Sequence, residues 1–224
     1  TLMNDGTVHI IQSLLNSVIV AVISCVLSVY ISALTAYGIY AYDFKLKKLA
    51  NTFIMVVLMV PTQVSALGYV DMMKTWGFVN ENALPALIFQ FIAMPAVFFF
   101  MRQYMESALP LEIVEAGRID GGHEFYIFNF VVLPIMKPAI AVQAIFTFVQ
   151  SWNSYFMPQL LMNLNSKAAT MPLAVAVMNT AAFDKQDLGE LYTTLGFAVV
   201  PLIVVYLLLS KYIIRGIALG SVKG

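Results

Sequence analysis

The longest uncharged stretch of this chain lies between Asp5 and Asp43, where no Asp, Glu, Lys or Arg occurs. A helix of about 20 apolar residues is long enough to cross a lipid bilayer. By this criterion the sequence predicts five membrane spans, at about residues 10–40, 49–70, 83–101, 131–161 and 191–214. We therefore expect an all-α fold, a polytopic transmembrane helical bundle that takes up residues 1–224 as a single domain.

The composition favours the same class of protein. Hydrophobic residues make up 61% of the chain and charged residues 11%, against about 45–50% and 25% in soluble domains. The formal net charge of 0 gives no basic footprint for nucleic acid. The single cysteine, Cys25, has no partner for an internal disulfide or a metal cluster. Four prolines, Pro61, Pro95, Pro158 and Pro201, lie in or near the apolar runs and are expected to kink their helices.

The Lys and Arg residues are shared unevenly between the two sets of segments that connect the spans. Nine of the 12 fall in one set, and the other set holds only Lys74, Lys167 and Lys185. Because cytoplasmic loops are enriched in Lys and Arg, we expect the richer set in the cytoplasm. The N-terminus of this sequence is then outside, its C-terminus is cytoplasmic, and residues 163–190 form an extracellular loop. An outside start without a signal peptide predicts one more span before Thr1, which gives six in the native chain.

The segment from Glu115 to Pro134 combines charged residues with three glycines, unlike the apolar runs around it. Pro110 and Glu112 favour the start of a short helix, and the sequence Ile-Asp-Gly-Gly predicts a turn. Asp120 is expected to cap a second helix that leads back to the membrane. Such a helix–turn–helix elbow suits docking to a cytoplasmic partner. An amphipathic loop at the lipid headgroups fits the composition equally well.

The spacing in this segment resembles the signature of bacterial ABC-importer permeases. That pattern is Glu-Ala-Ala, three residues, Gly, nine residues, then Ile-x-Leu-Pro. Here Glu115-Ala116-Gly117 precedes Gly121 at the matching distance, and Val131-Val132-Leu133-Pro134 follows. Gly117 and Val131 depart from the pattern but keep its size classes. Further stretches resemble the carbohydrate-uptake group, which includes the smaller membrane subunit of the maltose transporter: LLNSVIVAVISCVLS, FTFVQSWNSYFMPQLL and the ending RGIALGSVKG.

The resemblance implies a membrane translocation subunit with no catalytic residues and no cofactor of its own. Its cytoplasmic region, residues 102–130, would dock on an ATPase subunit dimer and couple ATP hydrolysis there to alternating access. The docking residues would be Glu115, Ala116, Gly117, Asp120 and Gly121. ATP and Mg²⁺ are expected at the partner ATPase, since this chain lacks the phosphate-binding motif G-x-x-x-x-G-K-[ST].

The resemblance also implies further partners and a location. These are a second homologous permease subunit, an extracellular solute-binding protein and the lipid bilayer of a bacterial plasma membrane. The solute would be a sugar or oligosaccharide, and the alternative is another solute such as a polyol or a glycerol-phosphate ester.

Polar and aromatic residues at membrane depth are candidates for the solute path. An aromatic ring covers the apolar face of a sugar and amides bond its hydroxyls; the candidates are Gln63, Gln150, Trp152, Asn153 and Tyr155. The alternative interpretation is packing, with hydrogen bonds between helices and an interfacial Trp. In the segment 163–190, the run TMPLAVAVM predicts a short helix, either in contact with the binding protein or buried against the bundle.

Two other classes of membrane protein fit the sequence poorly. A self-contained secondary transporter needs an ion-coupling residue inside its spans, and no Asp, Glu, Lys or Arg lies deep in any of the five. An intramembrane enzyme needs a cluster of metal ligands or a nucleophile with its base, and the sequence offers neither. His123 is expected to be a solvated or docking residue.

Overall fold

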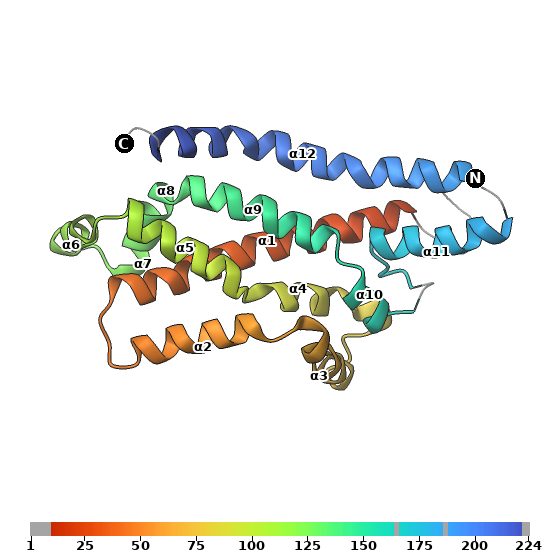
Figure 1. Ribbon diagram of the computed structural model, residues 1–224, viewed down its shortest axis with the longest axis horizontal. Helices are drawn as coiled ribbons and strands as arrows, with labels where there is room; N and C mark the ends of the chain where they lie inside the picture. Colours follow the sequence, from red (N-terminus) through yellow and green to blue (C-terminus); the bar gives the residue numbers. More distant parts are fainter. Residues whose placement is uncertain (1–9, 164–165, 186–187, 221–224) are drawn as a thin grey trace. The chain divides into compact units, whose positions relative to one another are not determined.

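The computed structural model describes residues 10–163, 166–185 and 188–220, and these residues form helices without a strand. Figure 1 labels the α-helices along the chain. The element bounds are α1 Ile10–Ala41, α2 Lys47–Met59, α3 Thr62–Thr75, the 3-10 helix η1 Asn80–Asn82, α4 Leu84–Ile92, α5 Pro95–Ala108, α6 Leu111–Ile119, α7 Glu124–Ile127, the π-helix η2 Phe128–Val132, α8 Leu133–Ile135, α9 Lys137–Trp152, α10 Phe156–Leu161, α11 Met171–Lys185 and α12 Leu188–Gly220. Three helical stretches are long and apolar enough to cross a membrane, and two bent helix pairs bring the number to five if each pair is one span. The expected all-α membrane bundle is confirmed.

The chain divides into two compact units. Unit 1 holds Thr1–Cys25, Thr62–Phe91 and Thr147–Leu207, and unit 2 holds Val26–Pro61, Ile92–Phe146 and Leu208–Gly224. The long helices α1, α9 and α12 therefore contribute residues to both units.

The core of unit 2 is built around the large buried side chains of Met101, Phe128 and Met136. Helix α1 presents Ala33 and Ala36 to this core, and such small side chains let neighbouring helices approach closely. Met105 and Leu109 extend the core from α5, and Val114 extends it into α6. The charged segment after α5 is therefore anchored in the core on one side.

The core of unit 1 contains polar contacts that hold the segment before α11 against α1. The buried amide of Asn16 donates to the carbonyls of Lys167 at 2.8 Å and Ala169 at 3.0 Å. The backbone N–H of Met171 donates to Ser17 Oγ at 2.7 Å. The run TMPLAVAVM does form a helix, α11, and its residues Met171, Leu173, Ala174 and Met178 are buried, which favours the packing interpretation.

Two of the predicted spans are interrupted. The predicted span 49–70 breaks at Val60–Pro61 into α2 and α3, since proline cannot continue the backbone hydrogen bonding of the helix. The predicted span 131–161 is wrong as one helix: the chain bends by 82° between α8 and α9, and α9 ends at Trp152. Helix α5 starts at Pro95, whereas α12 runs through Pro201 as one element.

Some expectations fall on residues that are not described. Residues 1–9, 164–165, 186–187 and 221–224 lie outside the described ranges, and with them part of the segment 163–190 and the end of the C-terminal tail.

Candidate functional site

The segment from Leu111 to Ile127, which we call the elbow, is a helix–turn–helix unit as the sequence predicts. Helix α6 ends in a Schellman motif, in which Gly122 N–H donates to Gly117 O and Gly121 N–H donates to Arg118 O, both at 3.0 Å. Gly121 has φ +81°, a left-handed conformation that glycine adopts without steric cost. The turn is therefore a defined structure rather than a loose loop.

The cap of the second helix differs from the prediction. Asp120 is exposed and ends α6, so it does not cap α7. His123 takes that place, and its Nδ1 accepts from the N–H of Tyr126 at 3.0 Å. The reason is the position of the left-handed residue. Gly121 closes α6, and Gly122 and His123 then lie between it and the start of α7 at Glu124.

A cluster of polar side chains ties the elbow to the end of α1. Arg118 Nε donates to Glu124 Oε1 at 2.6 Å, and the hydroxyl of Tyr37 donates to Glu124 Oε2 at 2.7 Å. The guanidinium of Arg118 lies 5.2 Å from the ring centre of Tyr42, a cation–π contact. The hydrogen bond to Glu124 raises the pKa of Arg118, so this group stays charged. Glu124 thus receives one bond from the elbow and one from α1.

Two more tyrosines of α1 reinforce this attachment, and the sequence analysis did not single them out. Tyr40 donates to the carbonyl of Leu109 at 2.6 Å, and Tyr30 donates to Asn129 Oδ1 at 3.1 Å. Residues 30 and 37 are seven apart and so share a helix face. Two tyrosines at this spacing, near the end of an apolar run, were the sequence pattern that could have indicated a polar contact face on α1.

The opposite side of the elbow is exposed. Glu115, Ala116, Asp120 and Gly121 are all exposed, and Ile119 is 85% exposed. Gly117 differs because it is half-buried. Four of the five docking candidates thus share an accessible rim with an apolar side chain, Ile119.

The two inner glycines are close to Ile127 of α7. A Cβ on Gly117 would lie 3.2 Å from Ile127 Cγ1. A Cβ on Gly122 would lie 2.9 Å from the carbonyl oxygen of Gly117 and 3.2 Å from Ile127 Cγ1. A side chain at position 122 would therefore clash with the backbone, whereas a side chain at position 117 would meet only the side chain of Ile127.

The solute-path candidates have different surroundings. Trp152 is 3% exposed and stacks on Phe148 with ring centres 5.8 Å apart, which matches the packing interpretation. Gln63, Gln150 and Asn153 are exposed. Tyr155 is 38% exposed and lines an open apolar hollow with Val175 and Leu195. Trp152 is thus set apart from the other four.

A small cavity in unit 1 collects polar groups that the candidate set omits. Gln90, Ser151 and Thr170 line it together with Ser17, and the hydroxyls of Ser151 and Thr170 are buried without a hydrogen-bond partner among the described residues. A cavity with several polar partners suits an ordered water.

Comparisons with known proteins identify the family. The sequence model of the binding-protein-dependent transport system inner membrane component matches residues 28–219. The chain belongs to this permease family. It is accordingly a multi-pass inner-membrane transport protein, and the resemblance seen in the sequence is confirmed.

Several curated relatives support this assignment. The permease is 30% identical over 223 residues to the arabinooligosaccharides transport system permease protein AraQ of Bacillus subtilis, covering 100% of this chain and 77% of the relative. It is 32% identical to the protein of the same name from Halalkalibacterium halodurans, covering 93% and 73%. It is 30% identical to the trehalose/maltose transport system permease protein MalG of Thermococcus litoralis, covering 99% and 79%.

A solved structure shares the fold of the permease. It is a crystal structure of a bacterial ABC transporter involved in the import of the acidic polysaccharide alginate, with a TM-score of 0.76 and 21% identity. The match covers 94% of the permease and 77% of that chain.

Proposed function

We propose that this permease is the translocation subunit of an ATP-driven importer of sugars or oligosaccharides. Its relatives are named as permeases of transport systems for arabinooligosaccharides and for trehalose and maltose, which supports a sugar or oligosaccharide as the solute. The energy comes from a separate ATPase dimer, which binds ATP and Mg²⁺. A solute-binding protein delivers the sugar, and a second homologous permease subunit completes the pathway.

The observation that carries the proposal is the two-sided character of the elbow. One side is anchored by Val114 and Ile127 in the core of unit 2 and by the bonds of Glu124 to Tyr37 and Arg118. The other side offers the exposed rim around Ile119. An element that transmits motion needs both a free docking face and a stiff connection to the spans.

The orientation follows from the distribution of Lys and Arg. The elbow lies in the cytoplasm in this arrangement, where the ATPase is, and the C-terminus lies on the same side. The segment around α11 lies outside, where the binding protein approaches.

The solute path in this chain runs past its exposed polar groups. Gln63, Gln150, Asn153 and Tyr155 are the residues we assign to it, because their side chains are accessible for hydroxyl contacts. We assign Trp152 a packing role rather than contact with the sugar, because it is buried and stacks on Phe148.

Docking can be tested with Ile119→Asp and Ala116→Trp in the complete transporter. Both residues are exposed and have ordinary backbone conformations, whereas a bulky residue at Gly121 would also strain its left-handed backbone. We expect the ATPase to be lost from the purified complex and sugar uptake to stop, while the permease stays monodisperse. Leu188→Asp, at a residue that is 49% exposed at the start of α12, is the matched control and should retain the ATPase. Full ATPase binding and uptake in both elbow variants would refute the proposal.

A further inference from the structure

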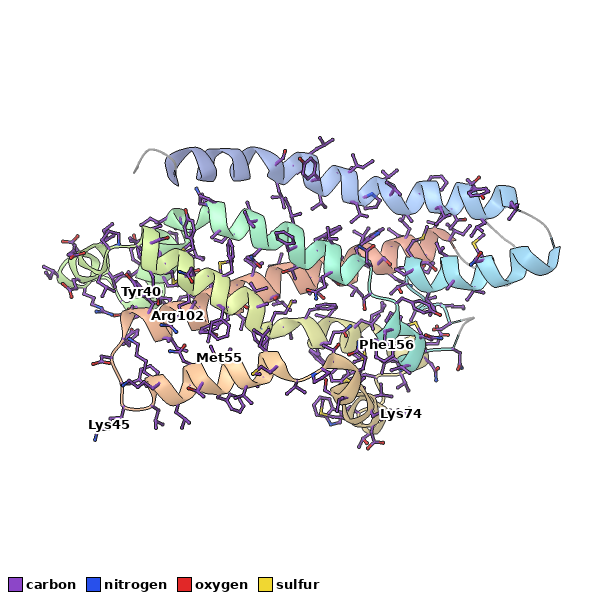
Figure 2. All side chains as sticks on the ribbon, viewed as in Figure 1. Tyr40, Lys45, Met55, Lys74, Arg102 and Phe156 are labelled. Carbon is purple, nitrogen blue, oxygen red and sulfur yellow. The ribbon has the colours of Figure 1, made fainter. Side chains whose placement is uncertain are left out.

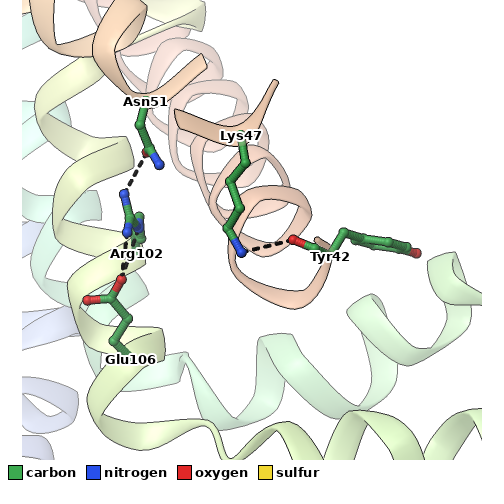
Figure 3. Close-up of polar contacts among 5 residues, drawn as sticks. All are labelled: Tyr42, Lys47, Asn51, Arg102 and Glu106. Atoms are coloured by element: carbon green, nitrogen blue, oxygen red, sulfur yellow. Dashed lines mark hydrogen bonds and ion pairs between the residues drawn. The ribbon is translucent and has the colours of Figure 1, made fainter. Parts of the chain in front are cut away.

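A cluster of lysines lies where α1 ends and α2 begins. Lys45, Lys47 and Lys48 fall within a few residues of each other, and Figure 2 shows Lys45 extending away from the helices. Lys47 Nζ donates to the carbonyl of Tyr42 at 2.9 Å (Figure 3). Lys45 and Lys48 are exposed, and neither forms an ion pair within the described part of the chain. Their charges are available to an outside ligand.

The basic residue of α5 that contacts α2 already has a carboxylate partner. Arg102 of α5 forms an ion pair with Glu106 at 2.9 Å and donates to Asn51 Oδ1 of α2 at 2.6 Å (Figure 3). This contact joins α2 to α5 one turn beyond the lysines. The three lysines at this end of α2 therefore keep their positive charge without a carboxylate partner among the described residues, and Lys45 and Lys48 are the exposed ones.

An open apolar groove in unit 2 lies further along α2. Its walls are Phe53 and Val57 of α2, Thr35 of α1, and Pro95 and Phe98 at the start of α5. Phe53 is 67% exposed, so the groove opens outward. The hydroxyl of Thr35 donates to the carbonyl of Ile31 at 2.8 Å, which leaves little polar character in the walls. Such a groove in a membrane-spanning bundle suits a hydrocarbon chain.

The groove and the lysines have the spacing of the two parts of a phospholipid. Val57 lies nine residues along α2 from Lys48, a rise of about 14 Å. The N-terminal end of α2 has exposed positive charge, and residues toward its C-terminal end line the apolar groove. We propose that this surface binds an anionic phospholipid, with the headgroup phosphate at Lys45 and Lys48 and an acyl chain in the groove between α1, α2 and α5.

The anionic headgroup follows from charge complementarity. Clusters of basic residues beside a membrane span attract lipids with net negative charge, and each nearby lysine strengthens that attraction. A zwitterionic lipid fills the groove equally well but gains less from the two free lysines. The site is independent of the solute that the permease carries.

The headgroup contact can be tested by native mass spectrometry of the complete transporter, titrated with palmitoyl-oleoyl phosphatidylglycerol or phosphatidylcholine. We expect preferential retention of phosphatidylglycerol, and a loss of about tenfold in its affinity in Lys45→Gln/Lys48→Gln. Lys74→Gln/Lys167→Gln removes two other exposed lysines and should leave the affinity unchanged. Equal losses in the two double variants, or equal retention of both lipids by the wild type, would overturn the proposal.

The acyl-chain contact has its own matched pair of variants. Val57 lines the groove and its neighbour Val56 does not, although both are exposed on α2. We expect Val57→Trp to lower binding of phosphatidylglycerol several-fold and Val56→Trp to leave it unchanged. Wild-type binding by Val57→Trp would contradict the assignment.

A crosslink on the otherwise native protein gives an independent answer. p-Benzoylphenylalanine in place of Phe53 should form an adduct with lipid in vesicles that contain phosphatidylglycerol. An adduct with another permease subunit or with another segment of polypeptide would show that a protein occupies the groove, and would overturn the proposal.

Discussion

The hydroxyl of Tyr37 donates a 2.7 Å hydrogen bond to Glu124, and so joins α1 to the first residue of α7. Tyr37 is buried and its ring also packs on Phe128, with ring centres 5.5 Å apart. The same carboxylate is held by Arg118 from the other side of the elbow turn. The elbow is therefore in direct contact with α1 through this carboxylate.

Tyr37→Phe should destabilise the permease by about 1–2 kcal/mol, because it removes a buried hydrogen bond to a charged group and keeps the ring. The measurement is the apparent melting temperature of the complete transporter in detergent. Tyr126→Phe is the control: this tyrosine is exposed, so its loss of a hydroxyl should change the stability by less than about 0.5 kcal/mol. Equal effects of the two substitutions would argue against a special role for Tyr37.

Glu124→Gln should separate docking from coupling. Arg118 and Glu124 are each more than one-third exposed, so their ion pair contributes little stability, of the order of 0–1 kcal/mol. We expect this variant to keep its ATPase subunits but to transport less sugar for each ATP hydrolysed, because the stiff link to α1 is weakened. The readout is the ratio of uptake to ATP hydrolysis in proteoliposomes. An unchanged ratio would contradict a role of this link in transmission.

The two inner glycines of the elbow should respond differently to alanine. Gly122→Ala forces a Cβ against the backbone carbonyl of Gly117, and we expect a loss of about 1–3 kcal/mol. Gly117→Ala meets only the side chain of Ile127, with Cγ1 as the nearest atom, so its cost should be smaller. Ile127→Ala removes that atom, so the double variant should cost less than the sum of the two single variants. Thermal unfolding of the three variants and the double variant tests this. Strictly additive costs of Gly117→Ala and Ile127→Ala would show that Gly117 is needed for another reason.

Asn16→Ala should destabilise unit 1 by about 1–3 kcal/mol. The substitution leaves the carbonyls of Lys167 and Ala169 without their hydrogen-bond donor. Gln12→Ala, at an exposed residue that donates to Asn16, should have a much smaller effect on the melting temperature. Equal effects of the two substitutions would contradict a stabilising role for the hydrogen bonds of Asn16 to Lys167 and Ala169.

Alanine substitutions of Trp152 and Gln150 should affect different properties, stability for Trp152 and the KM for uptake for Gln150, if our assignment of the solute path is right. Trp152→Ala empties a packed position and should cost about 3–5 kcal/mol of stability. Gln150→Ala removes an exposed amide and should raise the KM for sugar uptake with little change in stability. Uptake kinetics and melting temperatures of both variants provide the comparison. A normal KM in Gln150→Ala would remove this residue from the path.

Much of the fold was accessible from local sequence patterns. The uncharged run before Asp43 becomes α1, and the pair Gly121-Gly122 does form the turn of the elbow. These features depend on residues close together in the chain. The break at Pro61 also follows from the local chemistry of proline.

The features that were missed depend on contacts between distant residues. The bond of Tyr37 to Glu124 spans 87 residues, and no local pattern predicts it. The burial of Trp152 depends on Phe148 from the same helix and on Ala21 and Met171 from elsewhere in unit 1. Capping by His123 instead of Asp120 depends on how α6 closes, which is decided by the left-handed backbone at Gly121.

The π-helical stretch Phe128–Val132 affects how the elbow is joined to the helices that follow it. Phe128, Val132 and Met136 are spaced by four residues and are all buried in one core. In a regular α-helix each such step turns the side chains by about 40°, so the third would point well away from the first. The wider turn of Phe128–Val132 reduces this drift, and all three side chains reach the same core. Buried contacts therefore continue from the elbow through this stretch to Met136, where the chain bends by 82° into α9, so the elbow is joined to the core over several residues rather than at a single point.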